Sequence, residues 1–300
     1  MDLYKSCTLC PRRCGIDRTK YKGRCGQTSA LTAARASLHM WEEPCISGEN
    51  GSGTVFFSGC SLGCVYCQNS EISLSRSGEI IDEKRLCEIF YELREKGAHN
   101  INLVTATHFV PHIIRALDMA GDLGIPVLYN TSGYETVQTL RMLDGYIDIY
   151  MPDFKYMDKV TAKRYSDAED YPETAKAAIE EMVRQTGACA FDENGMMKSG
   201  TLVRHLVLPG KISDSKRIIE YLHNTYGNDI YMSIMSQYTP VPNVEDYPEI
   251  NRRVTQKEYD EVVDLAVSIG VENAFVQEGE AASESFIPAF DGEGIVRDFH

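Results

Sequence analysis

Short β-rich runs alternate with helical stretches along most of this chain, and this alternation constrains its fold more than any other feature of the sequence. The strands are expected at residues 54–58, 101–105, 126–130, 146–151, 201–208, 230–236 and 274–277. The helices are expected at residues 82–96, 111–123, 135–143, 172–185, 213–226 and 255–268. Six repeats of a strand and then a helix predict an α/β protein with a parallel sheet and helical crossovers. The sheet is either a doubly wound open sheet or a whole or partial barrel, and in each case ligands bind at the carboxyl ends of the strands.

The size and composition agree with such a fold and exclude several classes of function. The 300 residues suffice for one α/β barrel or for two average domains, and 43% hydrophobic with 25% charged residues is ordinary for a globular protein. The formal net charge of −14 opposes contact with phosphate backbones, so we expect no nucleic-acid partner. No apolar run reaches the ~18 residues of a membrane helix, and residues 1–5 lack the apolar core of a signal peptide. We therefore expect no membrane association and a cytoplasmic location.

The ten cysteines are distributed unevenly, with eight of them in the first 67 residues. In a reducing cytosol such crowding favours metal binding or catalysis over disulfides. We therefore divide the chain into a cysteine-rich N-terminal arm and connector, residues 1–50, and a barrel, residues 51–300. Cys87 is expected in the core beside the 82–96 helix, and Cys189 has no assigned function.

Three cysteines follow the first expected strand with the spacing C-x3-C-x2-C: Cys60, Cys64 and Cys67. Three thiolates so close together can bind one face of a four-iron cluster, which normally takes four cysteines, and they leave one iron open to a further ligand. The alternatives are a structural zinc site with a fourth ligand, or three unrelated core cysteines. The nearest histidines along the chain, His39 and His99, are distant from the loop in sequence.

Residues 59–69, with the aromatic Tyr66 just before the third cysteine, resemble the signature of radical S-adenosylmethionine (SAM) enzymes. Residues 56–59 and 68–69 resemble the activating enzymes of glycyl radical enzymes in particular. Further segments resemble the PflX branch, which is named for its likeness to pyruvate formate-lyase activating enzyme. They lie at residues 41–48, 130–134, 152–156, 204–210 and 235–240.

This resemblance implies a partial (β/α)6 barrel with a [4Fe-4S] cluster on Cys60, Cys64 and Cys67, and SAM bound at the open iron. It implies an oxidoreductase that cleaves SAM to methionine and a 5′-deoxyadenosyl radical. The radical then abstracts a hydrogen atom from a glycine of a partner glycyl radical enzyme. A flavodoxin- or ferredoxin-type reductant is expected. The alternatives are radical modification of a small molecule or peptide, and a non-catalytic metal-binding scaffold.

The resemblance also implies contacts to SAM at the strand ends. After the second strand, activating enzymes carry Gly-Gly-Glu-Pro. This chain departs from that motif and has Thr-Ala-Thr-His at residues 105–108. The hydroxyls and backbone carbonyls of these residues can still accept hydrogen bonds from the ammonium of SAM. Lys155 matches a family lysine that reaches SAM, and a point charge suits its carboxylate. Asp153, together with Thr131 and Met151, matches a family pocket for a monovalent cation. The expected cofactor contacts are Tyr66, Thr105, Thr107, His108, Asn130, Ser132, Asp153, Lys155 and Gln237. For Asn130 and Ser132 the alternative is turn formation, and for Lys155 it is an ion pair with Asp153.

The N-terminal arm contains a second group of cysteines with the spacing C-x2-C-x3-C-x10-C: Cys7, Cys10, Cys14 and Cys25. Four thiolates on a short segment suit a closed site for zinc or a second iron–sulfur cluster. Residues 1–26 contain seven basic and two acidic residues, a positive balance that favours deprotonated thiols. Cys45 is an alternative fourth ligand, and free thiols on a disordered arm are the alternative to a metal.

Overall fold

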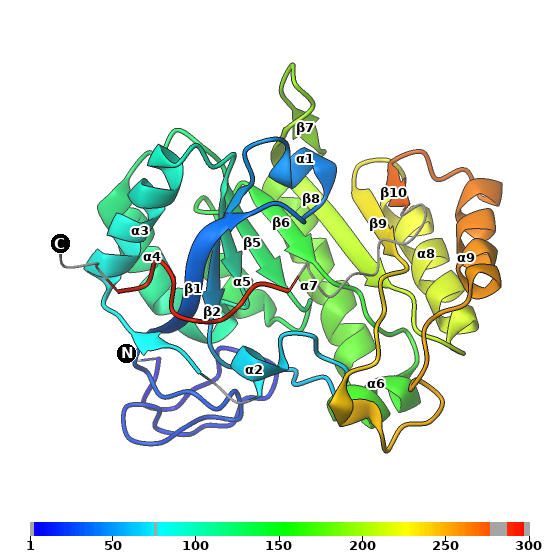
Figure 1. Cartoon of the computed structure of the whole chain (residues 1–300), viewed down its shortest axis with the longest axis horizontal. Coiled ribbons are helices and arrows are strands. Elements are labelled where there is room, and N and C mark those ends of the chain that lie inside the picture. The colour runs from blue at the N-terminus through cyan, green and yellow to red at the C-terminus, as the bar shows by residue number, and fades with distance from the viewer. Residues whose placement is uncertain (1–2, 75–76, 277–286, 297–300) are drawn as a thin grey trace.

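The computed structural model describes residues 3–74, 77–276 and 287–296, and it forms a 10-stranded sheet flanked by helices (Figure 1). The strands are β1 (Thr32–His39), β2 (Ser52–Phe57), β3 (Glu79–Ile80), β4 (Ile101–Val104), β5 (Val127–Thr131), β6 (Ile149–Pro152), β7 (Ala190–Phe191), β8 (Met197–Leu206), β9 (Tyr231–Met235) and β10 (Ala274–Val276). The helices are α1 (Pro44–Ser47), α2 (Ser70–Ser73), α3 (Glu83–Glu95), α4 (Val110–Ala120), α5 (Val137–Met142), α6 (Lys159–Ser166), α7 (Tyr171–Thr186), α8 (Ile212–Tyr226) and α9 (Gln256–Ser268). Short 3-10 helices span Thr107–Phe109 and Pro242–Val244.

The order of the strands distinguishes between the two predicted topologies. Across the sheet it is β10-β9-β8-β6-β5-β4-β2-β1-β3, and every neighbouring pair from β2 to β10 is parallel. A doubly wound sheet reverses its strand order at a switch point, whereas these parallel strands follow the chain without reversal. The predicted partial (β/α)6 barrel is therefore confirmed, with β2, β4, β5, β6, β8 and β9 each followed by a helix. The last expected strand is observed as β10 over Ala274–Val276, and Gln277 lies outside the described residues.

One strand of the sheet lies inside the segment that we predicted to be an arm and connector. β1 pairs antiparallel with β2, so the sheet begins at Thr32 and not near residue 51. The sequence gives little sign of it because three alanines weaken any contrast between its two faces. The segment 287–296 also reaches β1: the amide of Ala36 donates to the Glu293 carbonyl, and the amide of Gly292 donates to the Ala34 carbonyl. Figure 1 shows this segment in red across β1.

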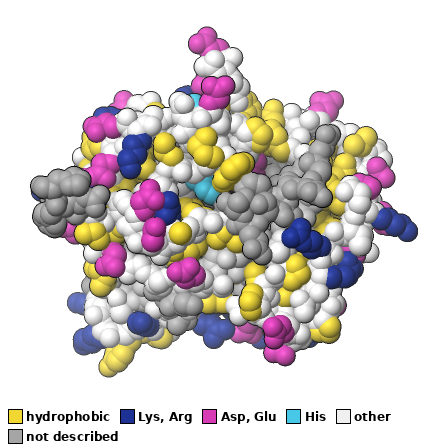
Figure 2. All heavy atoms as spheres, viewed as in Figure 1, with side chains coloured by type: hydrophobic (Ala, Val, Ile, Leu, Met, Phe, Trp, Pro, Cys, Tyr) yellow, Lys and Arg dark blue, Asp and Glu magenta, His cyan; other side chains and the backbone are white. Residues whose placement is uncertain are grey.

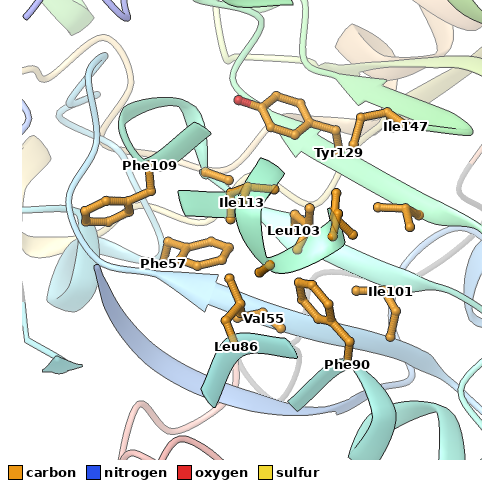
Figure 3. Packing of buried hydrophobic residues seen from close by; sticks show 14 of the residues in the cluster. Val55, Phe57, Leu86, Phe90, Ile101, Leu103, Phe109, Ile113, Tyr129 and Ile147 are labelled. Carbon is orange, nitrogen blue, oxygen red and sulfur yellow. The ribbon is translucent and has the colours of Figure 1, made fainter. Parts of the chain in front are cut away.

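The outer face of the sheet over β2 and β4 is covered by α3 and α4. Val55 of β2 and Leu103 of β4 project toward Phe90 and Ile113 of these helices, and all four side chains are fully buried (Figure 3). α3 begins where the carboxylate of Asp82 accepts from the amide of Arg85, which caps the helix. This packing fixes the positions of the strand ends, because each strand is held by the helix that follows it.

The inner faces of the strands change character along their length. Leu128, Ile149 and Leu202 form an apolar layer at 0% exposure, whereas Asn130 and Arg204, each two residues further on, are polar. Because side chains two residues apart share one face of a strand, these polar groups also point inward, nearer to the carboxyl ends. The barrel interior is therefore dry at one end and polar at the other.

Acidic and basic side chains are interspersed over the face seen in Figure 2. None of the helices in the described part of the chain is both long enough and apolar enough to cross a membrane.

The packing against α3 predicts a large loss of stability for Phe90→Ala. Removing a fully buried phenylalanine is expected to lower the free energy of unfolding by about 3–5 kcal/mol. Urea unfolding of the metal-free protein, followed by circular dichroism, measures this change. The matched control is Met119→Ala on the neighbouring helix, where the side chain is 53% exposed and the expected change is about 0.5 kcal/mol or less. Equal unfolding midpoints for both variants would contradict the packing.

Candidate functional site

A cavity lies at the carboxyl ends of the parallel strands, the place where the fold predicts a ligand site. All three cysteines of the C-x3-C-x2-C loop line it. The predicted cofactor contacts that also line it are Tyr66, Thr105, Asn130, Ser132, Asp153, Lys155 and Gln237. The structure therefore brings together residues that are spread over most of the chain.

The loop that presents the three thiols is held by neighbouring hydroxyl groups. Ser166 lies 3.1 Å from the sulfur of Cys64, and Ser73 of α2 lies 3.2 Å from the sulfur of Cys67. Burial raises the pKa of the Cys60 thiol to about 12, so this thiol is not activated as a nucleophile. The arrangement is suited to binding a metal group, for which thiolates are ligands.

Tyr66 supports the loop from within the core. Its ring is 5% exposed and makes edge-on contacts with Tyr156, Tyr165 and Tyr238 at centroid distances of 5.9–6.3 Å. Such edge-to-face pairs add stability beyond their buried area. Tyr238, which occupies the place of a family tyrosine–histidine pair together with Gln237, donates to the carbonyl of Ile250 and is fully buried.

A ladder of alternating charges crosses the cavity, centred on Arg204 of β8. Its guanidinium donates to Glu42 at 3.0 Å, to Asp153 at 3.2 Å and to the amide oxygen of Asn130 at 2.7 Å. Lys155 continues the ladder with a bond of 2.7 Å to the second oxygen of Asp153. Two carboxylates therefore balance two cations within this ladder.

Thr105 has an unusual backbone at the end of β4. Its φ of +60° lies in the left-handed region, which a β-branched residue rarely adopts. Its amide donates to the Asn130 carbonyl at 2.9 Å, and the residue lines the cavity. Conformations of this kind cost about 1–3 kcal/mol and are typical of functional sites.

Two predicted cofactor contacts, Thr107 and His108, do not line the cavity. After β4 the chain enters the 3-10 helix Thr107–Phe109, which places both side chains in the protein interior. The hydroxyl of Thr107 donates to the carboxylate of Glu135, and Nε2 of His108 lies 2.8 Å from the Ser58 carbonyl. Burial lowers the pKa of His108 to about 3, so the imidazole is neutral and Nε2 is the donor. These two residues position the chain and do not reach the cavity.

The predicted cation pocket is not supported either. Both oxygens of Asp153 are bound by protein cations, Lys155 and Arg204, and Met151 belongs to the apolar layer of the interior. Among the described residues no group of His, Cys, Asp and Glu side chains is placed to hold a single metal ion. Asp153 therefore already has two cationic partners within the protein.

Sequence reasoning assigned no role to Glu42 or Arg204, which lie 162 residues apart along the chain. The one signal available was a charged residue in the middle of a buried strand, where β8 places Arg204 between Val203 and His205. A charge at such a position requires a buried partner, but the sequence does not say which.

The four cysteines of the N-terminal arm lie close together. The arm itself packs against the loop that carries Cys60, Cys64 and Cys67. Burial raises the pKa of Cys25, the guanidinium of Arg18 opposes that change, and Cys7 and Cys14 lie close enough to raise it further. Burial also raises the pKa of Cys10 to about 12, with smaller contributions of the same sign from its neighbours Cys25 and Cys7. Cys45 is not part of this group.

Cys45 packs against the apolar interior layer of the barrel instead. Its neighbours include Leu128, Ile149 and the half-buried Cys189. Cys87 lies on the buried face of α3, as predicted from its position in the helix.

Comparison with known proteins agrees with the fold and the position of the cysteine loop. The model of the radical SAM superfamily matches residues 54–222, and the chain belongs to this superfamily. Its relatives include the uncharacterized protein MJ0674 of Methanocaldococcus jannaschii, 28% identical over 275 residues, a match that covers 88% of this chain and 75% of that protein. The structure of Streptococcus suis SuiB bound to S-adenosylmethionine is similar, with a TM-score of 0.50 and 14% identity over 74% of this chain and 48% of SuiB. That likeness concerns the fold, and the chain spans about half the length of SuiB.

Membership in the superfamily implies a [4Fe-4S] cluster and SAM, and the residues of the cavity fit both. Three free thiols from one loop line the cavity, and the described lining residues include no fourth cysteine. Three thiolates leave one iron available, which is the position that SAM requires. The protein is therefore a radical SAM enzyme. These matches do not distinguish the activating-enzyme branch that the sequence motifs resemble.

The charge ladder predicts that Arg204→Gln is strongly destabilising. The change leaves the buried carboxylates of Glu42 and Asp153 with one fewer cation, and breaking a buried pair typically costs about 3–5 kcal/mol. Urea unfolding of the metal-free protein measures the loss.

A double-mutant cycle separates the pairing from a general packing effect. In the Arg204→Gln background, Glu42→Gln is expected to cost less than it does alone, because its partner is already absent. Strictly additive costs would mean that the two side chains do not interact.

Proposed function

We propose that this chain generates a radical from SAM and uses it to remove a hydrogen atom from a glycine of a partner glycyl radical enzyme. The observation that supports this most directly is the cavity that brings Cys60, Cys64 and Cys67 together with Lys155. The chemistry supplied by a bound, reduced cluster is one-electron cleavage of SAM to methionine and a 5′-deoxyadenosyl radical, which becomes 5′-deoxyadenosine when it takes up the hydrogen atom.

In this proposal the side chains of the cavity bind and orient the cofactor. The three thiolates hold the cluster, and the ammonium of Lys155 attracts the carboxylate of SAM. Asn130 and Ser132 lie at the end of β5 and offer polar groups to the ribose. The aromatic cluster around Tyr66 keeps water away from the inner side of the loop.

The choice of glycine as hydrogen donor rests on the segments that resemble activating enzymes, above all residues 41–48. The structure places two of their residues, Trp41 and Glu42, in the lining of the cavity. Trp41 is 57% exposed, so it offers an apolar surface to an entering polypeptide segment. A flavodoxin- or ferredoxin-type protein is the proposed reductant.

The donor is identified by following the hydrogen atom. Anaerobic protein is incubated with SAM, dithionite and a candidate glycyl radical enzyme labelled with deuterated glycine. Deuterium in 5′-deoxyadenosine together with a glycyl radical signal in electron paramagnetic resonance supports the proposal. Cleavage of SAM without either result assigns the donor to another peptide or to a small molecule.

We expect Cys64→Ala to abolish SAM cleavage, because two thiolates do not hold a cluster with one open iron. The measurement is 5′-deoxyadenosine formed per chain after anaerobic reconstitution with iron and sulfide. Cys87→Ala is the matched control, since Cys87 lies on α3 away from the cavity and should retain cleavage. Product from the Cys64→Ala variant at the wild-type level would remove this loop from the site.

We expect Lys155→Ala to weaken SAM binding while the cluster remains. A hydrogen bond to a charged group is worth about 1.5–3 kcal/mol, which corresponds to roughly a tenfold to hundredfold increase in Kd. Equilibrium dialysis with labelled SAM measures this, and the visible spectrum confirms the cluster. Lys159→Ala, four residues along at an exposed position, should leave the Kd unchanged. An unchanged Kd for Lys155→Ala would show that Lys155 does not bind SAM and only forms the ion pair with Asp153.

A further inference from the structure

Two cysteines of the arm, Cys14 and Cys25, present their sulfurs to the same small space next to Gly23. A Cβ placed on Gly23 would lie 3.5 Å from the sulfur of Cys14 and 3.5 Å from the sulfur of Cys25. The amide of Gly15 donates to the Cys7 carbonyl, and the amide of Arg13 donates to the Cys10 carbonyl, so tight turns hold these residues together. All four thiols are free, and three of them are buried.

A closed set of four thiolates suits either a zinc ion or an iron–sulfur cluster. A zinc ion binds sulfur at about 2.3 Å, so its four ligands must lie within ~4 Å of one another. Within the described residues no three metal-binding side chains are placed to share a single ion. The same is true of Cys60, Cys64 and Cys67, to which we assign the cluster that the superfamily implies. A cluster is larger than one ion and suits four thiolates that are close without converging on one point.

Arg18 is a buried cation beside these thiols. It is 0% exposed, and its guanidinium lies 3.7 Å from the sulfur of Cys7. It donates to the carbonyls of Gln27, Thr28 and His108, and none of the described carboxylates is within ion-pair distance of it. A buried charge without a counter-ion is costly. An iron–sulfur cluster on four thiolates carries about two negative charges when oxidised, and it supplies the missing counter-ion.

The arm also contacts the loop of the cavity directly. A Cβ on Gly59, next to Cys60, would lie 2.6 Å from the carbonyl oxygen of Cys25. Arg12 donates to the carbonyls of Ser61 and Leu62 within the loop at 2.9 and 3.1 Å. Figure 1 shows the arm beside α2, at the same edge of the sheet. The arm that carries Cys25 therefore packs directly against the loop that carries Cys60.

From these contacts we propose that Cys7, Cys10, Cys14 and Cys25 bind a second iron–sulfur cluster, with Arg18 as its buried counter-charge, and that this cluster passes electrons to the cavity. One electron enters from a reduced flavodoxin- or ferredoxin-type protein, which is oxidised by one electron, and leaves toward the cluster of the Cys60 loop. Cys14 is the half-buried member of the four, and the backbone of Cys25 contacts Gly59, the residue before that loop. The relay rests on the proposed function, whereas the binding of the second cluster does not.

Metal analysis of a variant that lacks the cavity site tests the binding alone. The full chain carrying Cys60→Ala, Cys64→Ala and Cys67→Ala, purified anaerobically, is expected to retain about four irons and no zinc, against about eight irons in the wild type. Adding Cys10→Ala should remove the remaining iron. About one zinc per chain, or no metal, in the triple variant would overturn the proposal whether or not SAM is cleaved.

Potentiometry of the same triple variant tests Arg18. Reduction adds negative charge, which a nearby cation stabilises, so Arg18→Gln should shift the reduction potential of the arm cluster to a more negative value. Arg18→Lys keeps the charge and should stay near the parent value. The same potential in both variants would show that Arg18 is not the counter-charge.

The relay itself is tested in the protein with an intact Cys60 loop. With a reduced flavodoxin as donor, Cys10→Ala should form 5′-deoxyadenosine at least tenfold more slowly than the wild type, whereas dithionite should support both proteins equally. Equal rates with flavodoxin would exclude the relay, and loss of product with both reductants would point to damage at the cavity.

Discussion

The ion pairs of Arg204 are the interaction on which the site depends. This one side chain joins β8 to the end of β5 through Asn130, to the end of β6 through Asp153, and to the segment before α1 through Glu42. A buried ladder is weak evidence for net stability, because desolvation offsets much of the attraction. Its value lies in specificity, since any other register of these strands would leave a charge unpaired inside the barrel. The ladder therefore fixes the strand ends that form the floor of the cavity.

The cysteine loop is held from two sides by different means. On the inner side the ring of Tyr66 packs into a cluster of tyrosines, and on the outer side the arm supplies Arg12 to the loop carbonyls. The arm has little core of its own, because the buried apolar cluster within it consists of Tyr4, Cys7 and Leu9 with Cys14 packed against them. A segment this small is normally ordered by a bound metal or by docking against the rest of the protein. Here the contacts with the loop provide the docking. The arm and the loop therefore stabilise each other's conformation.

Local pattern predicted most of the fold and the centre of the site, and long-range pairing explains what it missed. The strand and helix repeats and the C-x3-C-x2-C loop are visible over a few residues each, because periodicity and spacing are local properties. β1 was missed because its alanines suit either face and its partner is antiparallel. Thr107 and His108, predicted as cofactor contacts, do not line the cavity because a 3-10 helix places them in the interior, which no spacing rule reports. Glu42 and Arg204 are meaningful only as a pair, and their separation of 162 residues hides that pairing from the sequence.

Lys155 is the point at which the charge ladder and the cysteine loop meet. Burial alone would lower its pKa, but Asp153 and the nearby Cys64 outweigh that effect and raise it, so the ammonium stays charged inside the protein. The ladder is neutral without any ligand, and one of its two cations lies against a loop whose thiolates are negative when they bind metal. A ligand that brings a carboxylate can therefore share Lys155 with Asp153 without leaving either charge unpaired. The charge ladder is thus compatible with the proposed contact between Lys155 and the carboxylate of SAM, because its four charges are already balanced without a ligand.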